Sequence, residues 1–176
     1  MAPTRIRRAI NSDAGPLARV HVDTWRTAYA GVVPADYLAG LSYEARESRW
    51  NDIFAAGQPA TSTFVAETDM GEIIGFASGG PERLGNPAYE GEIYAVYVLQ
   101  EHQRLGVGRR VFDAVVQQLL RDGFASMMLW VLEDNRRARR FYESMGGEQV
   151  GQRTITIGGA DLTELSYGWK DISGIA

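Results

Sequence analysis

The chain has 176 residues, with 18 basic and 22 acidic side chains, a formal net charge of −4 and no cysteine. This length, with 45% hydrophobic residues, suffices for one buried core without disulfides. The missing thiols exclude disulfides, thiolate metal sites and cysteine nucleophiles, and two histidines are too few for a His-rich metal site. We therefore expect a protein without a bound metal.

The charge and hydropathy patterns also limit the partners. A negative net charge argues against nucleic acid as the main partner, because phosphate binding requires concentrated positive charge. No apolar stretch approaches the ~18 to 20 residues that span a bilayer. Arg5, Arg7 and Arg8 are followed by polar residues rather than by the apolar run of an export signal. We expect a cytoplasmic protein that does not associate with membranes.

The N-terminal quarter predicts one strand and one helix. Residues 4–10 are typical of a short strand, and a helix begins at Ser12 or Asp13, with Pro16 in its first turn. The residues that recur on one face of this helix at three- and four-residue spacing are Leu17, Val20, His21, Thr24 and Trp25. Gly31 ends the segment.

A second helix and two strands follow. Residues 43–56 predict a helix whose core-facing residues are Trp50, Ile53 and Phe54. After this helix, apolar residues recur at every second position, which is typical of strands. Residues 63–67 and 72–78 predict antiparallel strands joined by a turn at Met70 and Gly71. Residues 91–98 form another strongly β-prone run.

The C-terminal half alternates helices and strands. Residues 106–121 predict a long helix with one apolar stripe, made of Val107, Val111, Val115 and Leu119. Residues 126–132 are almost continuously apolar, which is typical of a strand covered on both faces and parallel to its neighbour. Asp134 or Asn135 caps a further helix that runs to about Met145.

An antiparallel hairpin ends the chain, with strands at residues 154–157 and 162–169 and a turn at Gly158 and Gly159. The order of these elements predicts a mixed α/β fold on one sheet. No internal repeat, linker or low-complexity tract supports a domain boundary. We therefore expect a single domain over residues 1–176, with its core at about residues 4–170.

The segment that carries most chemical information is the turn after residues 91–98. Two glycines, Gly106 and Gly108, open the following helix, so its first free N–H groups face back over the strand end and can bind a pyrophosphate. Arg104 and Arg109 add positive charge. The third glycine of a dinucleotide site is replaced by Val111, and the glycine–lysine pair of a P-loop is absent. The glycines alone could also serve only a sharp connection.

Two spaced motifs in this chain resemble those of the GCN5-related N-acetyltransferases (GNAT). The segment from Gln103 to Gly108 is similar to that family's Q/R-x-x-G-x-G/A acetyl-CoA motif. The residues of the second matching block are Asn135, Ala138, Phe141, Tyr142 and Gly146. The resemblance implies an α/β fold in which a mixed, mostly antiparallel sheet with flanking helices has splayed central strands. One departure is Gln100, where the family often has proline.

The resemblance also implies roles for individual residues. The backbones of Val96 and Val98 would hold the pantetheine arm of acetyl-CoA, and Asn135 would hydrogen-bond the same region. The residues expected around the pyrophosphate are Gln103, Arg104, Leu105, Gly106, Val107, Gly108 and Arg109. Tyr142, one turn beyond Ala138 on the same helical face, would protonate the departing thiolate.

The general base is expected to be Glu92. It precedes Val96 and Val98 at even spacing on one strand, which predicts that all three share a face. Glu92 also matches the general-base glutamate in the histone-acetylating branch of the family. The alternative is that Glu92 is structural or solvated and that water removes the proton.

The acceptor pocket is expected at Trp25, Tyr29 and Tyr94, since the family's first helix walls its substrate site and Tyr94 shares the Glu92 face. Aromatic rings beside a carboxylate suit an amine or polyamine. Trp25 and Tyr29 are four residues apart on a helix, so plain core packing is the alternative. The cluster Arg136, Arg137, Arg139 and Arg140 is either a solvated helix face or a contact for the 3′-phosphate of CoA.

The resulting functional hypothesis is transfer of an acetyl group from acetyl-CoA to a primary amine of a small molecule, by direct attack on the thioester. Acetylation of a protein or peptide, at its N-terminus or a lysine, is one alternative. A non-catalytic module that senses acyl-CoA is another. The resemblance also makes a homodimer possible.

Overall fold

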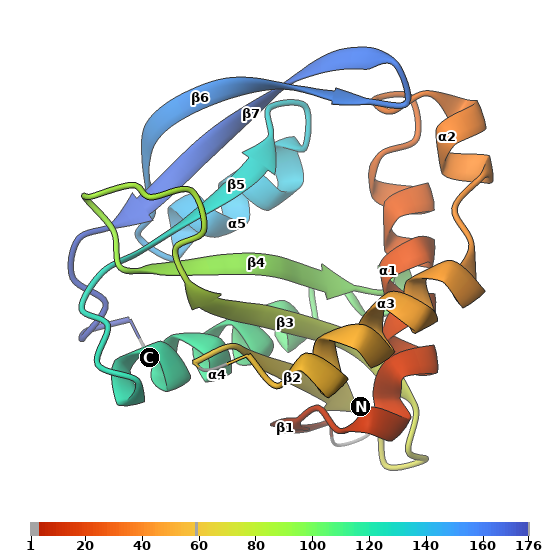
Figure 1. Ribbon diagram of the computed structural model, residues 1–176, viewed down its shortest axis with the longest axis horizontal. Helices are drawn as coiled ribbons and strands as arrows, with labels where there is room; N and C mark the ends of the chain where they lie inside the picture. The colour runs from red at the N-terminus through yellow and green to blue at the C-terminus, as the bar shows by residue number, and fades with distance from the viewer. Residues whose placement is uncertain (1–3, 59, 176) are drawn as a thin grey trace.

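The computed structural model describes residues 4–58 and 60–175, and its backbone forms one seven-stranded sheet. The strands are β1 (Arg5–Arg8), β2 (Ser62–Glu67), β3 (Ile73–Pro81), β4 (Gly91–Val98), β5 (Met127–Leu132), β6 (Glu148–Ile157) and β7 (Ala160–Trp169). Their order across the sheet is β1-β2-β3-β4-β5-β7-β6 (Figure 1). All neighbouring pairs are antiparallel except β4 and β5, which are parallel. The predicted mixed, mostly antiparallel fold is confirmed.

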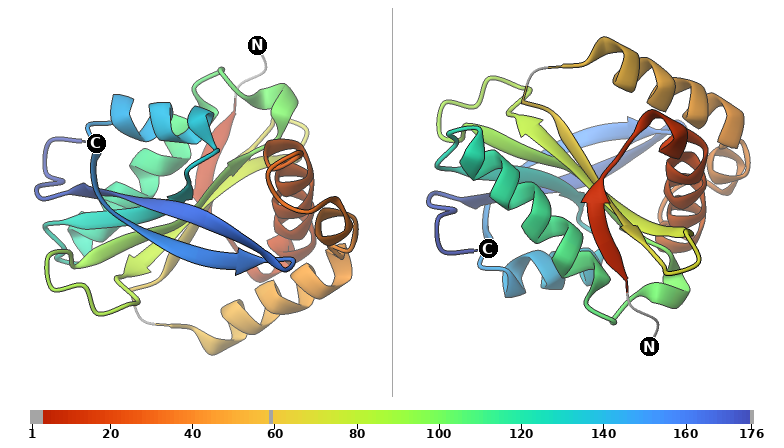
Figure 2. Two further views of the ribbon diagram at one scale, coloured as in Figure 1. Left: turned by 90° about the horizontal axis from the view of Figure 1, so that it is seen from above. Right: turned by 90° about the horizontal axis from the view of Figure 1, so that it is seen from below.

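Five α-helices flank the described sheet: α1 (Ala14–Ala28), α2 (Ala35–Ala39), α3 (Tyr43–Ala56), α4 (Val107–Arg121) and α5 (Arg136–Ser144). Figure 2 shows α4 and α5 on one side of the sheet and α1 and α3 on the other. Each side has its own apolar cluster, so the sheet is buried on both faces over its centre. Among the described residues, no helix combines the length and the apolar character needed to cross a membrane.

The apolar stripe of α4 forms the larger core, as its spacing predicted. The stripe residues Val107, Val111, Val115 and Leu119 are all buried, and they pack with the centre of the sheet. Met127, Met128 and Leu129 of β5 are covered on both faces, which confirms the strand predicted from the continuous apolar run.

The two central strands diverge. The parallel pairing of β4 and β5 holds only at Gly91 with Met127, Glu92 with Met128 and Ile93 with Leu129. Beyond Ile93 the strands separate, so one backbone edge of β4 has no strand beside it. This is the splay that the resemblance implied.

A β-bulge interrupts the alternation of β4. Ser78 of β3 pairs with Ala95 and the next residue, Gly79, pairs with Ile93, so Tyr94 is an extra residue without a partner. As a result Ile93 and Val96, three residues apart, pack into the same core cluster. Ala95 and Tyr97 face the cluster on the opposite side.

Several details differ from the sequence prediction, among them the start of β6, which lies at Glu148 rather than at residue 154. The short helix α2 was not predicted, because five residues are too few for a helical period to show. Strand β3 continues through Gly79 and Gly80 to Pro81 instead of ending at Ser78. Ile53 was expected in the core but is 37% exposed, since α3 buries only the stripe around Trp50 against the sheet.

We predict that Gly79→Ala destabilises the fold. A methyl group at Gly79 would lie 2.6 Å from Cγ1 of Val115 and 2.9 Å from the Glu92 carbonyl oxygen, so α4 or the bulge must shift. Such overpacking costs about 1 to 3 kcal/mol of unfolding free energy, measurable by urea denaturation. Gly174→Ala, where a methyl group meets open space, is the control and should leave the stability unchanged. Equal stability of the two variants would contradict the close packing.

Candidate active site

A cavity of about 610 Å³ opens where β4 and β5 diverge. Its walls come from the end of α1, from β4 and β5, from the glycine turn before α4 and from the start of α5. The predicted site residues that line it are Tyr29, Tyr94, Val96, Val98, Gln103, Arg104, Gly106, Gly108, Arg109, Asn135, Ala138 and Tyr142. The predicted residues outside the lining are Trp25, Glu92, Leu105 and Val107. The structure thus gathers both sequence motifs around one space.

The glycine turn presents backbone to this cavity. Arg104 and Gly106 adopt left-handed conformations, with φ of 63° and 79°, and Gly106 caps α4. A methyl group at Gly108 would have only Cγ2 of Val98, at 3.8 Å, as a neighbour, so the space above Gly108 is open. Val107 is instead buried in the core and the Leu105 side chain is 43% exposed. These two residues can contribute only their backbone groups to an anion site.

The free edge of β4 also faces the cavity. The Leu99 N–H donates to the Ile74 carbonyl oxygen at 2.9 Å, on the β3 side. Because successive residues of a strand direct their N–H and C=O groups to opposite edges, Val98 and Val96 direct theirs toward β5. The side-chain amide of Gln103 donates to the Val98 carbonyl oxygen at 2.7 Å. Gln103 therefore joins the glycine turn to the strand edge.

Helix α5 places Tyr142 in the cavity wall. The Asn135 side chain caps the helix by accepting a hydrogen bond from the Ala138 N–H at 3.1 Å. One turn beyond Ala138, the Tyr142 ring packs near Phe112 and Phe141 and is 7% exposed. Burial, reinforced by nearby Tyr97, raises the pKa of the Tyr142 hydroxyl well above its ordinary value. The hydroxyl is therefore protonated at neutral pH and can donate.

The acceptor side is an aromatic cluster built around Tyr97, a residue that the sequence prediction missed. Tyr97 lines the cavity, and its hydroxyl accepts a hydrogen bond from the indole N–H of Trp25 at 3.0 Å. Trp25 also packs edge-on against Tyr29, with ring centroids 4.9 Å apart. Trp25 thus supports two lining residues without lining the cavity itself. The sequence did contain a signal for Tyr97. Alternation along the strand, which assigned Val96 and Val98 to one face, assigns Tyr97 to the opposite face.

His21 belongs to the same cluster but is a poor base. Its ring stacks on Trp25 and meets Tyr97 edge-on, and its Nε2 is buried without a hydrogen-bond partner among the described residues. Burial and the positive charges of Arg46 and Arg49 lower the pKa of His21 to about 3. His21 is therefore neutral near pH 7.

The prediction that Glu92 shares a strand face with Val96 and Val98 is wrong. Because Tyr94 is an extra residue in the bulge, Glu92 lies on the face opposite Ile93, Val96 and Val98. Its carboxylate is buried and accepts three hydrogen bonds from Arg83, from the backbone N–H and Nε at 3.1 Å and from Nη2 at 2.5 Å. The Arg83 guanidinium also lies over the Tyr94 ring, at 4.0 Å from the centroid.

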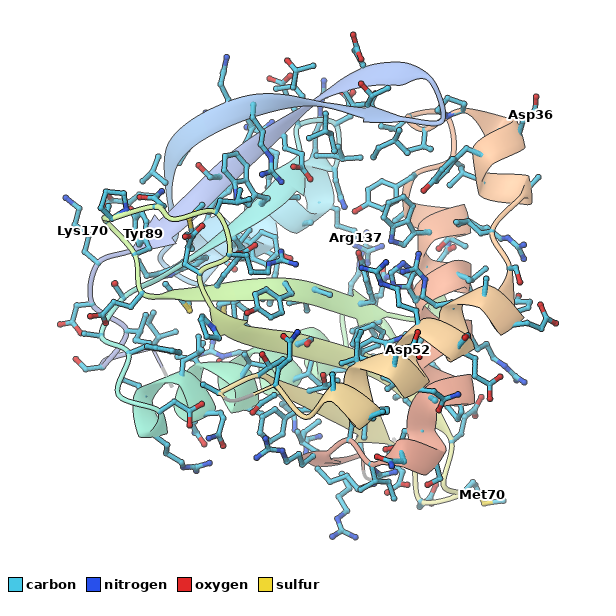
Figure 3. The ribbon with its side chains drawn as sticks, in the orientation of Figure 1. Asp36, Asp52, Met70, Tyr89, Arg137 and Lys170 are labelled. Atoms are coloured by element: carbon cyan, nitrogen blue, oxygen red, sulfur yellow. The ribbon has the colours of Figure 1, made fainter. Side chains whose placement is uncertain are left out.

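Further residues line the cavity, among them Arg137, for which the sequence left a contact with the 3′-phosphate of CoA open, and Trp130, which the sequence did not predict. Figure 3 shows Arg137 beside the opening between α1 and α5, and Arg137 is the member of the α5 arginine cluster that lines the cavity. Trp130 of β5 also lines it, beneath the guanidinium of Arg153 at 4.1 Å from the ring centroid. Among the described residues, no group of three or more histidine, aspartate or glutamate side chains could hold a metal ion.

Comparison with known proteins identifies the family. The profile of the acetyltransferase (GNAT) family matches residues 23–147. The chain belongs to this family. The uncharacterized N-acetyltransferase YuaI of Bacillus subtilis strain 168 is 39% identical to this GNAT protein over 170 residues, which is 97% of this chain and 95% of the relative. The family match and this relative identify an N-acetyltransferase.

Solved structures share the fold. The PaiA N-acetyltransferase of Thermoplasma acidophilum, in complex with coenzyme A, superposes with a TM-score of 0.73 at 19% identity, over 92% of this chain and 98% of that one. YncA of Salmonella typhimurium, with its cofactor acetyl-CoA, has a TM-score of 0.71 at 20% identity, over 98% and 96% of the two chains. The element order of this GNAT chain is therefore that of acetyltransferases.

The contacts of Glu92 with Arg83 favour the alternative that Glu92 is structural and that water removes the proton, so we predict a small catalytic effect of Glu92→Gln. We expect kcat to fall less than about tenfold. Removal of a general base would lower kcat by ~10²- to 10⁴-fold. The unfolding free energy should fall by about 1 to 3 kcal/mol, since hydrogen bonds to a charged group are lost while Arg83 can reach water. Glu72→Gln, at an exposed turn, is the control. A loss of 100-fold or more in kcat would restore Glu92 as the base.

Proposed function

We propose that this GNAT enzyme transfers the acetyl group of acetyl-CoA to a primary amine of a small molecule. The observation that carries the proposal is that the glycine turn, the free edge of β4, Tyr142 and the Tyr97 cluster all border one cavity. The coenzyme A and acetyl-CoA in the two solved acetyltransferases of the same fold support this choice of acetyl donor.

The cavity provides groups that suit each part of acetyl-CoA. The free N–H groups at the start of α4, with Arg104 and Arg109, would bind the pyrophosphate, because they concentrate positive charge at the open space above Gly108. The outward peptide groups of Val96 and Val98 would pair with the amides of the pantetheine arm, with Asn135 near the same region. Acetyl-CoA supplies an activated thioester.

The residues of the chain then assist direct transfer. The neutral amine attacks the thioester carbonyl carbon, a C–N bond forms and the C–S bond breaks. The backbone N–H of Val96 stabilises the negative charge that develops on the carbonyl oxygen. The buried Tyr142 hydroxyl donates its proton to the thiolate. The extra proton of the amine passes to water, and Tyr142 regains a proton from water.

The closed acceptor side favours a small molecule over a peptide. The β6–β7 hairpin reaches across to α2 (Figure 1), and a methyl group at Gly158 in its turn would lie 2.7 Å from Cβ of Tyr37. Leu38 and Val33 form an apolar cluster with the hairpin residues Ile155 and Leu162. This bridge limits the room for an extended chain. The single-domain organisation, the cytoplasmic location and a homodimer stay predictions.

We predict that Gly108→Ala weakens acetyl-CoA binding without weakening the fold. The methyl group enters the open space of the cavity and meets only Val98, at an ordinary contact distance of 3.8 Å. In thermal melts, acetyl-CoA at ~100 times its dissociation constant should raise the wild-type midpoint by roughly 5 to 10 °C. The variant should lose most of that rise and keep the melting midpoint of the free protein. A full rise in the variant would place the pyrophosphate elsewhere, and no rise in the wild type would refute acetyl-CoA as the donor.

We predict that Tyr142→Phe lowers kcat by roughly 10- to 10⁴-fold, the range for a lost general acid, with acetyl-CoA binding almost unchanged. Release of free thiol in the presence of a panel of amines and peptides measures the rate. Tyr89→Phe is the matched control, since Figure 3 shows Tyr89 far from Arg137 and the cavity opening, and it should act like the wild type. An unchanged rate in Tyr142→Phe would remove this residue from proton donation. Turnover of peptides alone would exclude the small-molecule acceptor.

A further inference from the structure

The wall of the cavity holds no charged group that could take a proton from an amine. Among the described residues that line it, none is an aspartate, a glutamate, a histidine or a lysine. Glu92 lies outside this lining and is bound by Arg83. The acidic residues of α1, α2 and α3 also lie outside it, namely Asp23, Asp36, Glu44, Glu47 and Asp52. An attacking amine must therefore lose its proton through an uncharged group of the wall or directly to water.

Tyr97 is an uncharged group on the acceptor side of this wall. Its ring packs with Ala95 against the apolar cluster that includes residues of α1, whereas Val96 between them packs against the cluster of α4 and α5. The Tyr97 side chain is partly buried and lines the cavity. Its hydroxyl oxygen accepts a hydrogen bond from the indole N–H of Trp25 at 3.0 Å. Tyr97 therefore joins α1 to the cavity wall.

The Tyr97 hydroxyl has hydrogen-bonding capacity left. A phenol oxygen offers one proton to donate and lone pairs that accept. The Trp25 N–H occupies one lone pair, and this is the one hydrogen bond of the hydroxyl among the described residues. A second lone pair and the proton are therefore available to a bound molecule or to water. A hydroxyl with both can accept one proton while it gives up another.

The same hydroxyl is protonated at neutral pH. Burial raises the pKa of Tyr97 above its ordinary value, although the hydrogen bond from Trp25 acts in the opposite direction. Tyr97 is therefore unsuited to act as a tyrosinate base. The hydrogen bond from Trp25 also polarises the O–H bond, since hydrogen bonds in a chain strengthen one another. A hydroxyl in this state can pass a proton on without carrying a charge before or after the transfer.

Aromatic contacts hold the Tyr97 hydroxyl in place. The Tyr97 ring meets Phe76 and His21 edge-on, with centroids 5.5 and 5.0 Å away. The Trp25 ring stacks on His21, with centroids 5.7 Å apart, and meets Tyr29 edge-on. Both partners of the hydrogen bond are thus packed against more than one ring, so the available lone pair of Tyr97 keeps one direction.

Tyr97 and Tyr142 line the same cavity from opposite faces of β4. Tyr142 belongs to the core cluster of α4 and α5, and Tyr97 packs against the cluster on the α1 side. The free edge of β4, where the thioester would bind, lies between the two faces. An amine that enters from the acceptor side would therefore approach the thioester beside Tyr97, and the sulfur would leave toward Tyr142.

We propose that the Tyr97 hydroxyl relays the proton of the attacking amine to water and that Trp25 positions it for this step. The inference rests on the proposed acetyl transfer and adds a catalytic residue to it. As the C–N bond forms, an N–H bond of the amine breaks and its proton moves to the available lone pair of Tyr97. The original hydroxyl proton leaves to a water molecule at the same time, so Tyr97 ends the step unchanged. Trp25 is a positioning residue, because it contacts the Tyr97 oxygen and does not line the cavity.

The test compares amines that need this relay with amines that need it less. Thiol release is measured with propylamine against 2,2,2-trifluoroethylamine and with 2-phenylethylamine against 2,2-difluoro-2-phenylethylamine. Where another amine is used better, that amine and its analogue fluorinated on the neighbouring carbon take their place. Fluorine makes the protonated nitrogen more acidic, so the fluorinated amine loses its proton to water readily. Tyr97→Phe should lower kcat about 10- to 100-fold with the parent amine and less than about threefold with the fluorinated one, with acetyl-CoA affinity unchanged.

Further variants separate the relay from packing. Trp25→Phe keeps the Tyr97 hydroxyl but removes its donor, and kcat should fall about three- to tenfold. The double variant should be no slower than Tyr97→Phe alone, since Trp25 acts through the missing hydroxyl. Because the double variant lacks both partners of the hydrogen bond, it also supplies the comparison if Tyr97→Phe, with its unpaired indole N–H, does not fold. Tyr43→Phe is the control, because the Tyr43 hydroxyl is bound to Asp23 outside the cavity lining, and it should act like the wild type.

The outcomes separate this inference from the proposed function. Equal losses for the parent and the fluorinated amine would assign Tyr97 to packing and overturn the relay, while acetyl transfer would stand. An unchanged kcat in Tyr97→Phe would overturn the relay as well. A further loss in the double variant would remove Trp25 from its positioning role. Without thiol release by the wild type with any amine, the relay and the proposed function would fail together.

Discussion

The divergence of β4 from β5 after Ile93 is the constraint on which the rest of the site depends. Separating two strands at the centre of a sheet leaves backbone groups without their usual partners, and buried groups of that kind are costly. In this chain the Gln103 side chain binds the Val98 carbonyl oxygen, and the remaining groups of the β4 edge face the cavity. The same divergence that weakens the sheet thus makes a strand edge available to an extended ligand.

The core keeps this opening at a fixed place. The α4 stripe and the buried strand β5 pack around the three residue pairs that remain joined, and Gly79 lets α4 approach the sheet closely at the bulge. The bulge then reverses which residues of β4 face which side. Because of this reversal, one strand presents Val96 and Val98 to the core side and Tyr97 to the acceptor side.

Charge is distributed in a similarly specific way. Glu92 and Glu164 each have an arginine partner, whereas Arg46 and Arg49 have no acidic one among the described residues. The three hydrogen bonds from Arg83 reach both oxygens of Glu92 and take up three of the about four acceptor sites of its carboxylate. The carboxylates of Glu92 and Glu164 are therefore each paired with an arginine of a neighbouring segment.

The sequence by itself determined the order of the elements, the glycine turn at Gly106 and Gly108, the Asn135 cap and the position of Tyr142 on its helix. These features depend on local periodicity, capping and backbone freedom, which short segments carry in themselves. Only the tertiary structure decided the face of Glu92, because the bulge arises from pairing with β3. It also decided the pairing of Glu92 with Arg83 and the hydrogen bond from Trp25 to Tyr97, since neither contact follows from the period of a single element. Spacing along one strand or helix cannot show them.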